Sequence, residues 1–185
     1  MTAIQHAGRI GIRVYGTPIP QGSKVANFHA PGVRDSNDKK LRPWRKTVRA
    51  QAEDTCRYHE PLTGPVRVWL RFTFERPPSH YRTGRNAHLV RDSAPSFPGT
   101  KHGDIDKLTR AIFDALTDAG VWNDDTQVVD VRARKFYATE DEYALARAGV
   151  DIVVESLEVD TPLTTVPALG GEAGAGTVHT QGAAS

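Results

Sequence analysis

The sequence predicts an α+β protein in which a small mixed β-sheet packs with two main helices. Apolar and polar residues alternate over residues 66–74, which is the period of a strand with one buried face. Over residues 104–119, apolar residues recur three and four positions apart, which is the period of an amphipathic helix. Because 185 residues are enough to bury one core of ordinary size, we expect a single domain over residues 1–160.

Three further segments have the alternating pattern of strands. They begin at about residues 10, 126 and 149 and end at about residues 15, 137 and 159. In the segment 126–137 the pattern predicts two chemically different faces. One face carries Asp130, Arg132 and Arg134, and the other carries mainly apolar residues together with Lys135.

Another helix is predicted from Pro43, which suits a first helical turn, to about His59. Trp44 and Val48 begin its apolar stripe, and four basic side chains are expected on the other side: Arg42, Arg45, Lys46 and Arg49. The helix over 104–119 is expected to end at Gly120, a residue that caps helix C-termini easily.

Charge is distributed unevenly along the chain. Residues 1–103 contain 18 Lys and Arg against 7 Asp and Glu, whereas residues 104–185 contain 6 against 15. A basic surface around an acidic centre would attract polyanions by neutralising phosphates and releasing counterions. Two solvated faces that attract each other would have the same composition.

Two segments have no sustained period. Residues 77–103 carry many basic side chains. A connection of this length is usually functional or disordered. We therefore expect either a flexible basic lid that contacts substrate or a disordered insertion. Residues 161–185 are rich in Gly, Ala and Thr and contain a single charge at Glu172, so we expect a disordered tail.

The sequence also favours a cytoplasmic protein. Cys56 is the only cysteine, which excludes an intrachain disulfide and a cysteine zinc cluster. No apolar run approaches the roughly 20 residues that span a bilayer, and the first residues do not resemble a signal peptide.

Two acidic clusters stand out in the acidic half. Asp104 and Asp106 come where the helix over 104–119 begins, and Asp124 and Asp125 follow that helix in a short link. Acids at a helix start can be explained as capping residues, and Asp-Asp is common in turns. If the two clusters converge, however, carboxylates would repel one another unless a cation such as Mg²⁺ lies between them. Such a cation can activate a phosphate for hydrolysis, and Lys107 and Arg110 could hold that phosphate.

Residues 103–138 resemble the signature of the RusA-type Holliday junction resolvases, which are crossover-junction endodeoxyribonucleases of bacteria and phages. The signature combines Asp-x-Asp, a basic residue, Asp-Ala-Leu, a Gly-Val-Trp turn, Asp-Asp and Gln-Val-Val. These appear here as Asp104, Asp106, Lys107, Leu108, Arg110, Asp114-Ala115-Leu116, Gly120-Val121-Trp122, Asp124-Asp125 and Gln127-Val128-Val129.

The resemblance implies a small homodimeric α/β enzyme that nicks opposing strands of a four-way DNA junction with Mg²⁺, for which Mn²⁺ may substitute. The essential carboxylates of the family correspond to Asp104, Asp106 and Asp125, with Asp124 as a helper. The family's important lysine corresponds to Arg110. Because arginine does not readily give up a proton, we expect Arg110 to act electrostatically; a proton-transfer role would fall to Lys107.

Predicted DNA contacts come from three parts of the chain. The segment 21–24 could cradle a phosphate, but it lacks the spacing of a nucleotide-binding loop, so no nucleotide cofactor is expected. The predicted contacts are Gln21, Ser23, Lys24, Arg82, Arg85, Lys101, Arg132, Arg134 and Lys135.

The sequence therefore predicts a Mg²⁺-dependent nuclease that resolves Holliday junctions in recombination and repair. Its alternatives are a nuclease for other branched DNA, a non-catalytic branched-DNA-binding protein, and a regulatory partner protein without affinity for DNA.

Overall fold

A computed structural model describes residues 8–22, 24–26, 33–35 and 37–157. The main elements, in chain order, are β1 (Arg9–Tyr15), β2 (Lys24–Ala26), β3 (Val33–Asp35), α1 (Asp38–Thr55), β4 (Val66–Phe74), α2 (Ile105–Asp118), β5 (Val128–Tyr137) and β6 (Gly149–Ser156). Short 3₁₀ turns occur at Pro78–His80, Gly84–Asn86, Thr100–His102 and Asp125–Gln127. The predicted tail over 161–185 lies outside the described residues.

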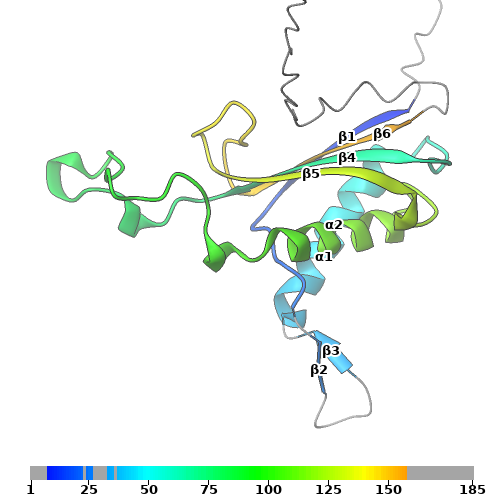
Figure 1. Ribbon diagram of the computed structural model, residues 1–185, viewed down its shortest axis with the longest axis horizontal. Helices are drawn as coiled ribbons and strands as arrows, with labels where there is room; N and C mark the ends of the chain where they lie inside the picture. Colours follow the sequence, from blue (N-terminus) through cyan, green and yellow to red (C-terminus); the bar gives the residue numbers. More distant parts are fainter. Residues whose placement is uncertain (1–7, 23, 27–32, 36, 158–185) are drawn as a thin grey trace, which may run out of the picture.

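The main sheet has the strand order β1-β6-β4-β5, and both long helices pack on one of its faces (Figure 1). β4 pairs in parallel with β5, whereas β6 is antiparallel to both β1 and β4. A parallel pair needs a crossover connection, and here α2 supplies it. The prediction of a small mixed sheet with two main helices is confirmed.

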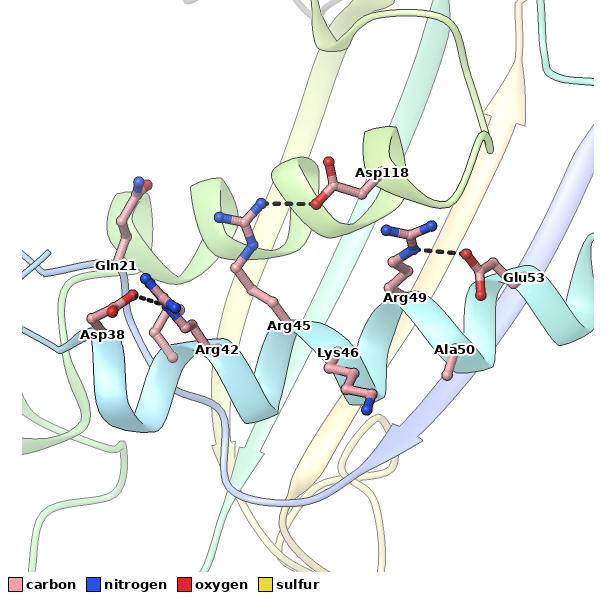
Figure 2. Close-up of a pocket in the computed structure, with 10 residues that line it drawn as sticks. Gln21, Asp38, Arg42, Arg45, Lys46, Arg49, Ala50, Glu53 and Asp118 are labelled. Atoms are coloured by element: carbon pink, nitrogen blue, oxygen red, sulfur yellow. Dashed lines mark hydrogen bonds and ion pairs between the residues drawn. The ribbon is translucent and has the colours of Figure 1, made fainter. Parts of the chain in front are cut away.

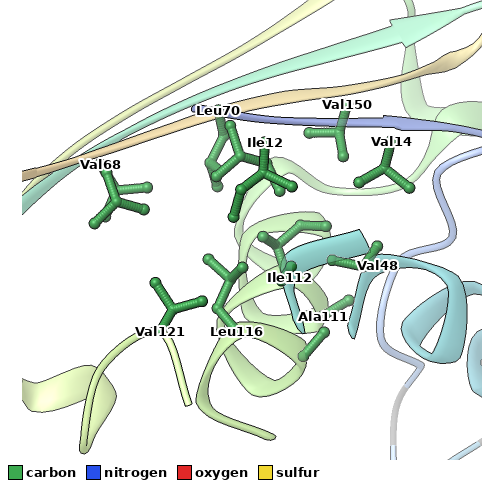
Figure 3. Packing of buried hydrophobic residues seen from close by; sticks show 14 of the residues in the cluster. Ile12, Val14, Val48, Val68, Leu70, Ala111, Ile112, Leu116, Val121 and Val150 are labelled. Atoms are coloured by element: carbon green, nitrogen blue, oxygen red, sulfur yellow. The ribbon is translucent and has the colours of Figure 1, made fainter. Parts of the chain in front are cut away.

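The core lies between the sheet and the two helices (Figure 3). From β4, the apolar residues at alternate positions from Val66 to Phe74 point into it, and none is more than 2% exposed. Helix α2 contributes Leu108, Ile112 and Leu116, which are all 1% exposed or less. Burial of these side chains fixes α2 across β4 and β5, at about 1.5–3 kcal/mol for each large side chain.

Helix α1 starts five residues before the predicted start, so Pro43 lies inside it. Proline gives up one backbone hydrogen bond there. Leu41 and Trp44 are both buried on the core, and Arg42 forms an ion pair with Asp38 one turn earlier, with a nitrogen–oxygen distance of 2.7 Å. These contacts extend the helix through the proline, which a sequence rule cannot anticipate.

Strand bounds follow the prediction closely for β1 and β4, whereas β6 ends at Ser156, three residues before its predicted end. β5 begins two residues late because a 3₁₀ turn occupies Asp125–Gln127, and a register shift at its start leaves Val129 63% exposed. The hairpin of β2 and β3 was not predicted. Trp122, in the link after α2, is a core residue that is 1% exposed and donates to the Thr117 hydroxyl.

The long connection after β4 contains short 3₁₀ turns but no α-helix, and Arg76 at its start holds it in place. Arg76, which is 9% exposed, forms a two-pronged ion pair with Glu140 and donates to the carbonyl of Pro95 at 3.0 Å. Its guanidinium also lies over the Tyr137 ring, 4.0 Å from the ring centre. This buried cation therefore ties the connection, at Pro95, to the end of β5 and to Glu140 beyond it, contrary to a disordered insertion.

Among the residues that the structure describes, no helix is both long enough and apolar enough to cross a bilayer.

We expect Glu140→Gln to loosen this connection, because it leaves the buried Arg76 without its charged partner. The free energy of unfolding should fall by about 1–3 kcal/mol, and trypsin should cut within residues 77–103 faster. Asp92→Asn is the matched control, since Asp92 pairs with Arg82 but is 92% exposed, and a change within about 0.5 kcal/mol is expected there. Equal effects of the two variants would contradict the buried role of Arg76.

Candidate active site

The first acidic cluster lies at the N-terminus of α2. Asp104 precedes the helix with an extended backbone, but its side chain makes no capping hydrogen bond. It forms an ion pair with Lys107 instead, with 3.0 Å between Nζ and Oδ2. The explanation of Asp104 as a side-chain cap is therefore wrong: its carboxylate is turned toward the cation one turn along the helix.

The chain before Asp104 is held from two sides. Gly103 has φ +83°, and a Cβ there would come within 2.5 Å of the Pro20 ring. Lys135 in β5 donates to the Gly103 carbonyl at 3.1 Å, and the backbone N–H of Gln21 donates to the Lys107 carbonyl at 3.0 Å. Contacts from β5 and from the segment before β2 therefore fix where α2 begins.

Asp106, Arg110 and Asp125 line one pocket of about 480 Å³ between α2 and β5. All three side chains are exposed to solvent. The remaining lining residues are mostly apolar: Ile105, Thr109, Phe113, Val131 and Ala133. The fold thus brings residues from both acidic clusters, with a cation, to the same pocket.

Asp124 and Asp125 have different surroundings although they are adjacent. Asp124 accepts a hydrogen bond from the Thr126 N–H at 2.9 Å and forms a capping box with Gln127. The hydrogen bonds with Thr126 lower the pKa of the Asp124 carboxyl. Asp124 therefore shapes the turn, and that turn presents Asp125 to the pocket.

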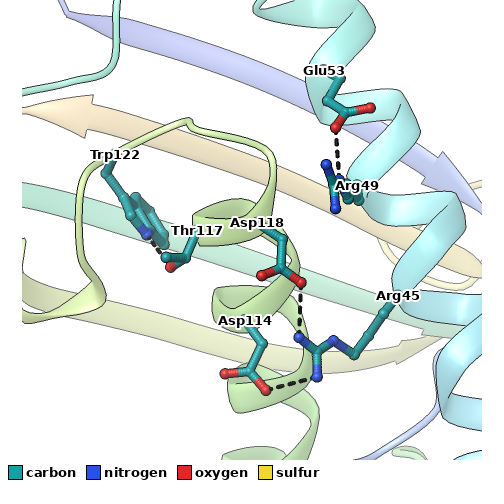
Figure 4. Close-up of polar contacts among 7 residues, drawn as sticks. All are labelled: Arg45, Arg49, Glu53, Asp114, Thr117, Asp118 and Trp122. Atoms are coloured by element: carbon teal, nitrogen blue, oxygen red, sulfur yellow. Dashed lines mark hydrogen bonds and ion pairs between the residues drawn. The ribbon is translucent and has the colours of Figure 1, made fainter.

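A second polar contact, between α1 and α2, lines a smaller separate pocket that also includes Asp125 (Figure 4). Arg45 bridges Asp114 and Asp118 of α2, at 3.2 and 3.0 Å. Burial raises the pKa of Asp114, Arg45 opposes that rise, and the nearby charge of Asp125 adds to it. The sequence did not assign Asp114 or Arg45 to the site, although Asp114 follows Arg110 by one turn on the same helix face.

Each acidic cluster contributes one residue to the pocket, Asp106 and Asp125, and Asp104 and Asp124 are not among its lining residues. Asp106 and Asp114 are eight residues apart on α2, which is about 12 Å of helix, and Asp125 lines a smaller pocket with Asp114. Among the described residues, no three His, Cys, Asp or Glu side chains form a group that could hold a metal ion. The binding of one ion by Asp104, Asp106 and Asp125 stays a prediction.

The predicted basic face of α1 is largely neutralised (Figure 2). It lines a groove of about 610 Å³. Arg42 pairs with Asp38 and Arg49 with Glu53, each at 2.7 Å, and Arg45 is held by the acids of α2. This groove therefore carries less free positive charge than the sequence suggests.

The predicted DNA contacts are not on one surface. Lys135 is on the pocket side of β5, whereas the register places Arg132 and Arg134 on the opposite face of the sheet. The basic side chains of the long connection, Arg82, Arg85 and Lys101, are exposed, and Arg82 is paired with Asp92. Ser23 lies outside the described residues, as does the side chain of Lys24, and Gln21 is half-buried.

Comparison of the chain with known proteins identifies its family. Residues 16–145 match the model of the family described as Endodeoxyribonuclease RusA. The chain belongs to the RusA family. The matched residues include α1, β4, α2 and β5, and with them every residue that lines the pocket.

Individual relatives match over different lengths. Crossover junction endodeoxyribonuclease RusA of Escherichia coli K12 is 51% identical over 43 residues, which is 23% of this chain and 36% of that protein. The protein of the same name from Enterobacteria phage 82 matches to the same extent. The chain therefore matches only about a third of the length of these RusA proteins. Uncharacterized protein YqaN of Bacillus subtilis is 27% identical over 134 residues, covering 71% of this chain and 89% of YqaN.

We expect Gly103→Ala to destabilise the start of α2, because it combines a positive φ with a clash against Pro20. The free energy of unfolding should fall by at least about 1–3 kcal/mol. Gly84→Ala is the control, because Gly84 also has a positive φ, +64°, but open space around it. Thermal or denaturant unfolding measures both, and an equal loss would show that the contact with Pro20 contributes nothing.

Proposed function

We propose that this RusA-family protein is a divalent-metal-dependent endodeoxyribonuclease that resolves Holliday junctions by paired nicks during recombination and repair. The observation that carries the proposal is the pocket shared by Asp106, Arg110 and Asp125 within the residues that match the family. The names of the E. coli and phage relatives support the junction as the substrate.

The residues present suit Mg²⁺ by their chemistry. Mg²⁺ prefers oxygen ligands, keeps several waters and is usually bound through one or two carboxylates together with substrate phosphates. Asp106 has no ion-pair partner among the described residues and is exposed, so it is the first candidate ligand. Asp104 and Asp125 are the others, with Asp124 fixing the turn beside them. When bound, Mg²⁺ or Mn²⁺ would polarise the scissile phosphate and promote attack by water.

Arg110 is the residue that we propose to hold the scissile phosphate. It lies one turn after Asp106 in the same pocket and makes no ion pair closer than 4 Å among the described residues. Its planar group can bind two phosphate oxygens at once and can stabilise the charge that develops there. Lys107 is already paired with Asp104, so its role is to orient that carboxylate.

Each protomer of a homodimer would cut one strand, which accounts for nicks related by symmetry. A nuclease for other branched DNA remains the enzymatic alternative, and cleavage of a junction against a flap or fork separates the two. The second alternative is a non-catalytic branched-DNA-binding protein. That alternative holds if the wild type nicks no branched DNA with Mg²⁺ or Mn²⁺.

Asp106→Asn should reduce the nicking rate at least about a hundredfold, because it removes a charged ligand from the cation while keeping the size of the side chain. Junction affinity measured without metal should be kept or become tighter, since one negative charge near the phosphate is lost. Asp92→Asn removes an exposed carboxylate outside the pocket, so the nicking rate and the junction affinity should both stay unchanged. A fully active Asp106→Asn variant would remove Asp106 from the metal site.

Substitutions at Arg110 test whether this side chain acts electrostatically or a residue at this position transfers a proton. Arg110→Gln should slow nicking by about 10²–10³-fold, as expected for loss of a donor to a developing charge. Arg110→Lys restores the charge and should recover most of that rate, with a pH profile like that of the wild type. A new rise in rate with pH in Arg110→Lys alone would indicate that a lysine at this position transfers a proton.

A further inference from the structure

The main sheet has a second face that neither long helix covers. α1 and α2 both pack on the same side (Figure 1). The side chains on the other side are those that alternate with the core residues of β1, β6, β4 and β5. We call this the open face, and its charged residues are Arg9, Arg13, Arg67, Arg71, Asp130, Arg132, Arg134, Asp151 and Glu155.

Acids on the open face form ion pairs with arginines on neighbouring strands. Asp151 of β6 is shared by Arg13 and Arg71, at 3.3 and 3.1 Å. Arg67 pairs with Asp130 at 2.7 Å and lies 3.8 Å from Glu155. The three acids therefore fix Arg13, Arg67 and Arg71, and they leave an excess of three positive charges on this face.

Two of the three excess arginines are on β5, at one edge of the sheet, and the third, Arg9, is on β1 at the other edge. Arg132 and Arg134 are both exposed, and neither has an acidic partner within the described part of the chain. They are two residues apart on one strand, so their side chains leave the same face about 7 Å apart. This differs from α1, where an acid accompanies Arg42, Arg45 and Arg49.

Aromatic rings orient several guanidinium groups on the open face or beside it. Arg134 lies over Phe136 with 4.8 Å to the ring centre, and Arg67 lies over Trp69 at 5.5 Å. Stacking of this kind uses the flat side of the guanidinium and leaves its N–H donors free in the plane. An arginine held in this way loses less side-chain entropy when it binds a phosphate.

We propose that the open face is a second DNA-binding surface, on which Arg132 and Arg134 contact the phosphates of one duplex arm. Excess positive charge with free donors suits a polyanion, whereas a second copy of the chain would bring the same positive charge against it. The identification of the arm as part of branched DNA rests on the proposed function.

The position of β5 explains how such a surface would select branched DNA. Val131 and Ala133 of β5 line the catalytic pocket on one side of the sheet, while Arg132 and Arg134 lie on the other side. Duplex DNA is stiff over about 150 base pairs, so a single short linear duplex cannot bend around one edge strand to reach both surfaces. Two arms that diverge from a junction can lie on the two sides of β5 at once.

The test is the salt dependence of junction affinity, measured without divalent metal, for the wild type and for the double variant Arg132→Gln/Arg134→Gln. Each lost phosphate contact should lower the slope of log K against log salt by about 0.9, so the slope should fall by nearly two. Junction affinity near 0.1 M salt should fall roughly tenfold to hundredfold. Melting temperature should not change, because both side chains are exposed.

The matched control is Lys39→Gln/Lys46→Gln, which removes the same charge from exposed positions on α1, in the helical layer. It should leave the slope unchanged. An unchanged slope in Arg132→Gln/Arg134→Gln, or an equal loss in the control, overturns the proposal. A change in the oligomeric state of Arg132→Gln/Arg134→Gln by sedimentation, with an unchanged slope, would assign the open face to protein contact instead.

Nicking of the junction with Mg²⁺ is measured separately and decides the proposed function. A wild type that never nicks, together with the expected loss of slope, supports the second DNA surface and rejects the nuclease. A wild type that nicks, with no loss of slope, supports the nuclease and rejects the surface. A wild type without salt-dependent affinity for the junction overturns both.

Discussion

The parallel pairing of β4 with β5 is the constraint on which the rest of the molecule depends. Parallel neighbours cannot be joined by a tight turn, so the chain must cross the sheet as α2 before it returns as β5. The apolar stripe of α2 is buried against β4, and this leaves its polar face along the edge of the sheet. Both acidic clusters are attached to that one helix, so its position over β5 decides that Asp106 and Asp125 line the same pocket.

The two ends of the pocket are held by different means. At the start of α2, a glycine in the left-handed region allows Pro20 to approach, and Lys135 anchors the carbonyl before Asp104. At the other end, Asp124 closes a turn that presents Asp125. Residues between them lie on a rigid helix, so phosphate contacts made by Arg110 would have a fixed relation to both acids. Rigid support of this kind is what a site needs to act on a transition state.

Basic residues fall into two classes in the tertiary structure. On α1 the arginines serve packing between helices and are matched by acids on α1 and α2, as the bridge from Arg45 to Asp114 and Asp118 shows. On β5 the arginines of the open face have no such acids among the described residues. Surface ion pairs add little stability, so their main consequence here is to reduce the free charge available to a polyanion. Among the described residues of these two elements, the arginines without an acidic partner are therefore those of β5, and the positive charge left on α1 is that of its lysines.

The sequence by itself determined the strand over 66–74 and the helix near 104–119, because periods of two and of 3.6 are local properties of the side chains. It also determined that Arg132 and Arg134 share a face. Pro43 inside α1, the turn before β5 and the role of Arg76 depend on partners that are distant in the chain, such as Glu140 and Pro95. Only the tertiary structure decided that Asp106 and Asp125 share a pocket and which arginines are neutralised. The first depends on how α2 packs beside β5, and the second on the packing of α1 on α2, which brings Arg45 to its acids.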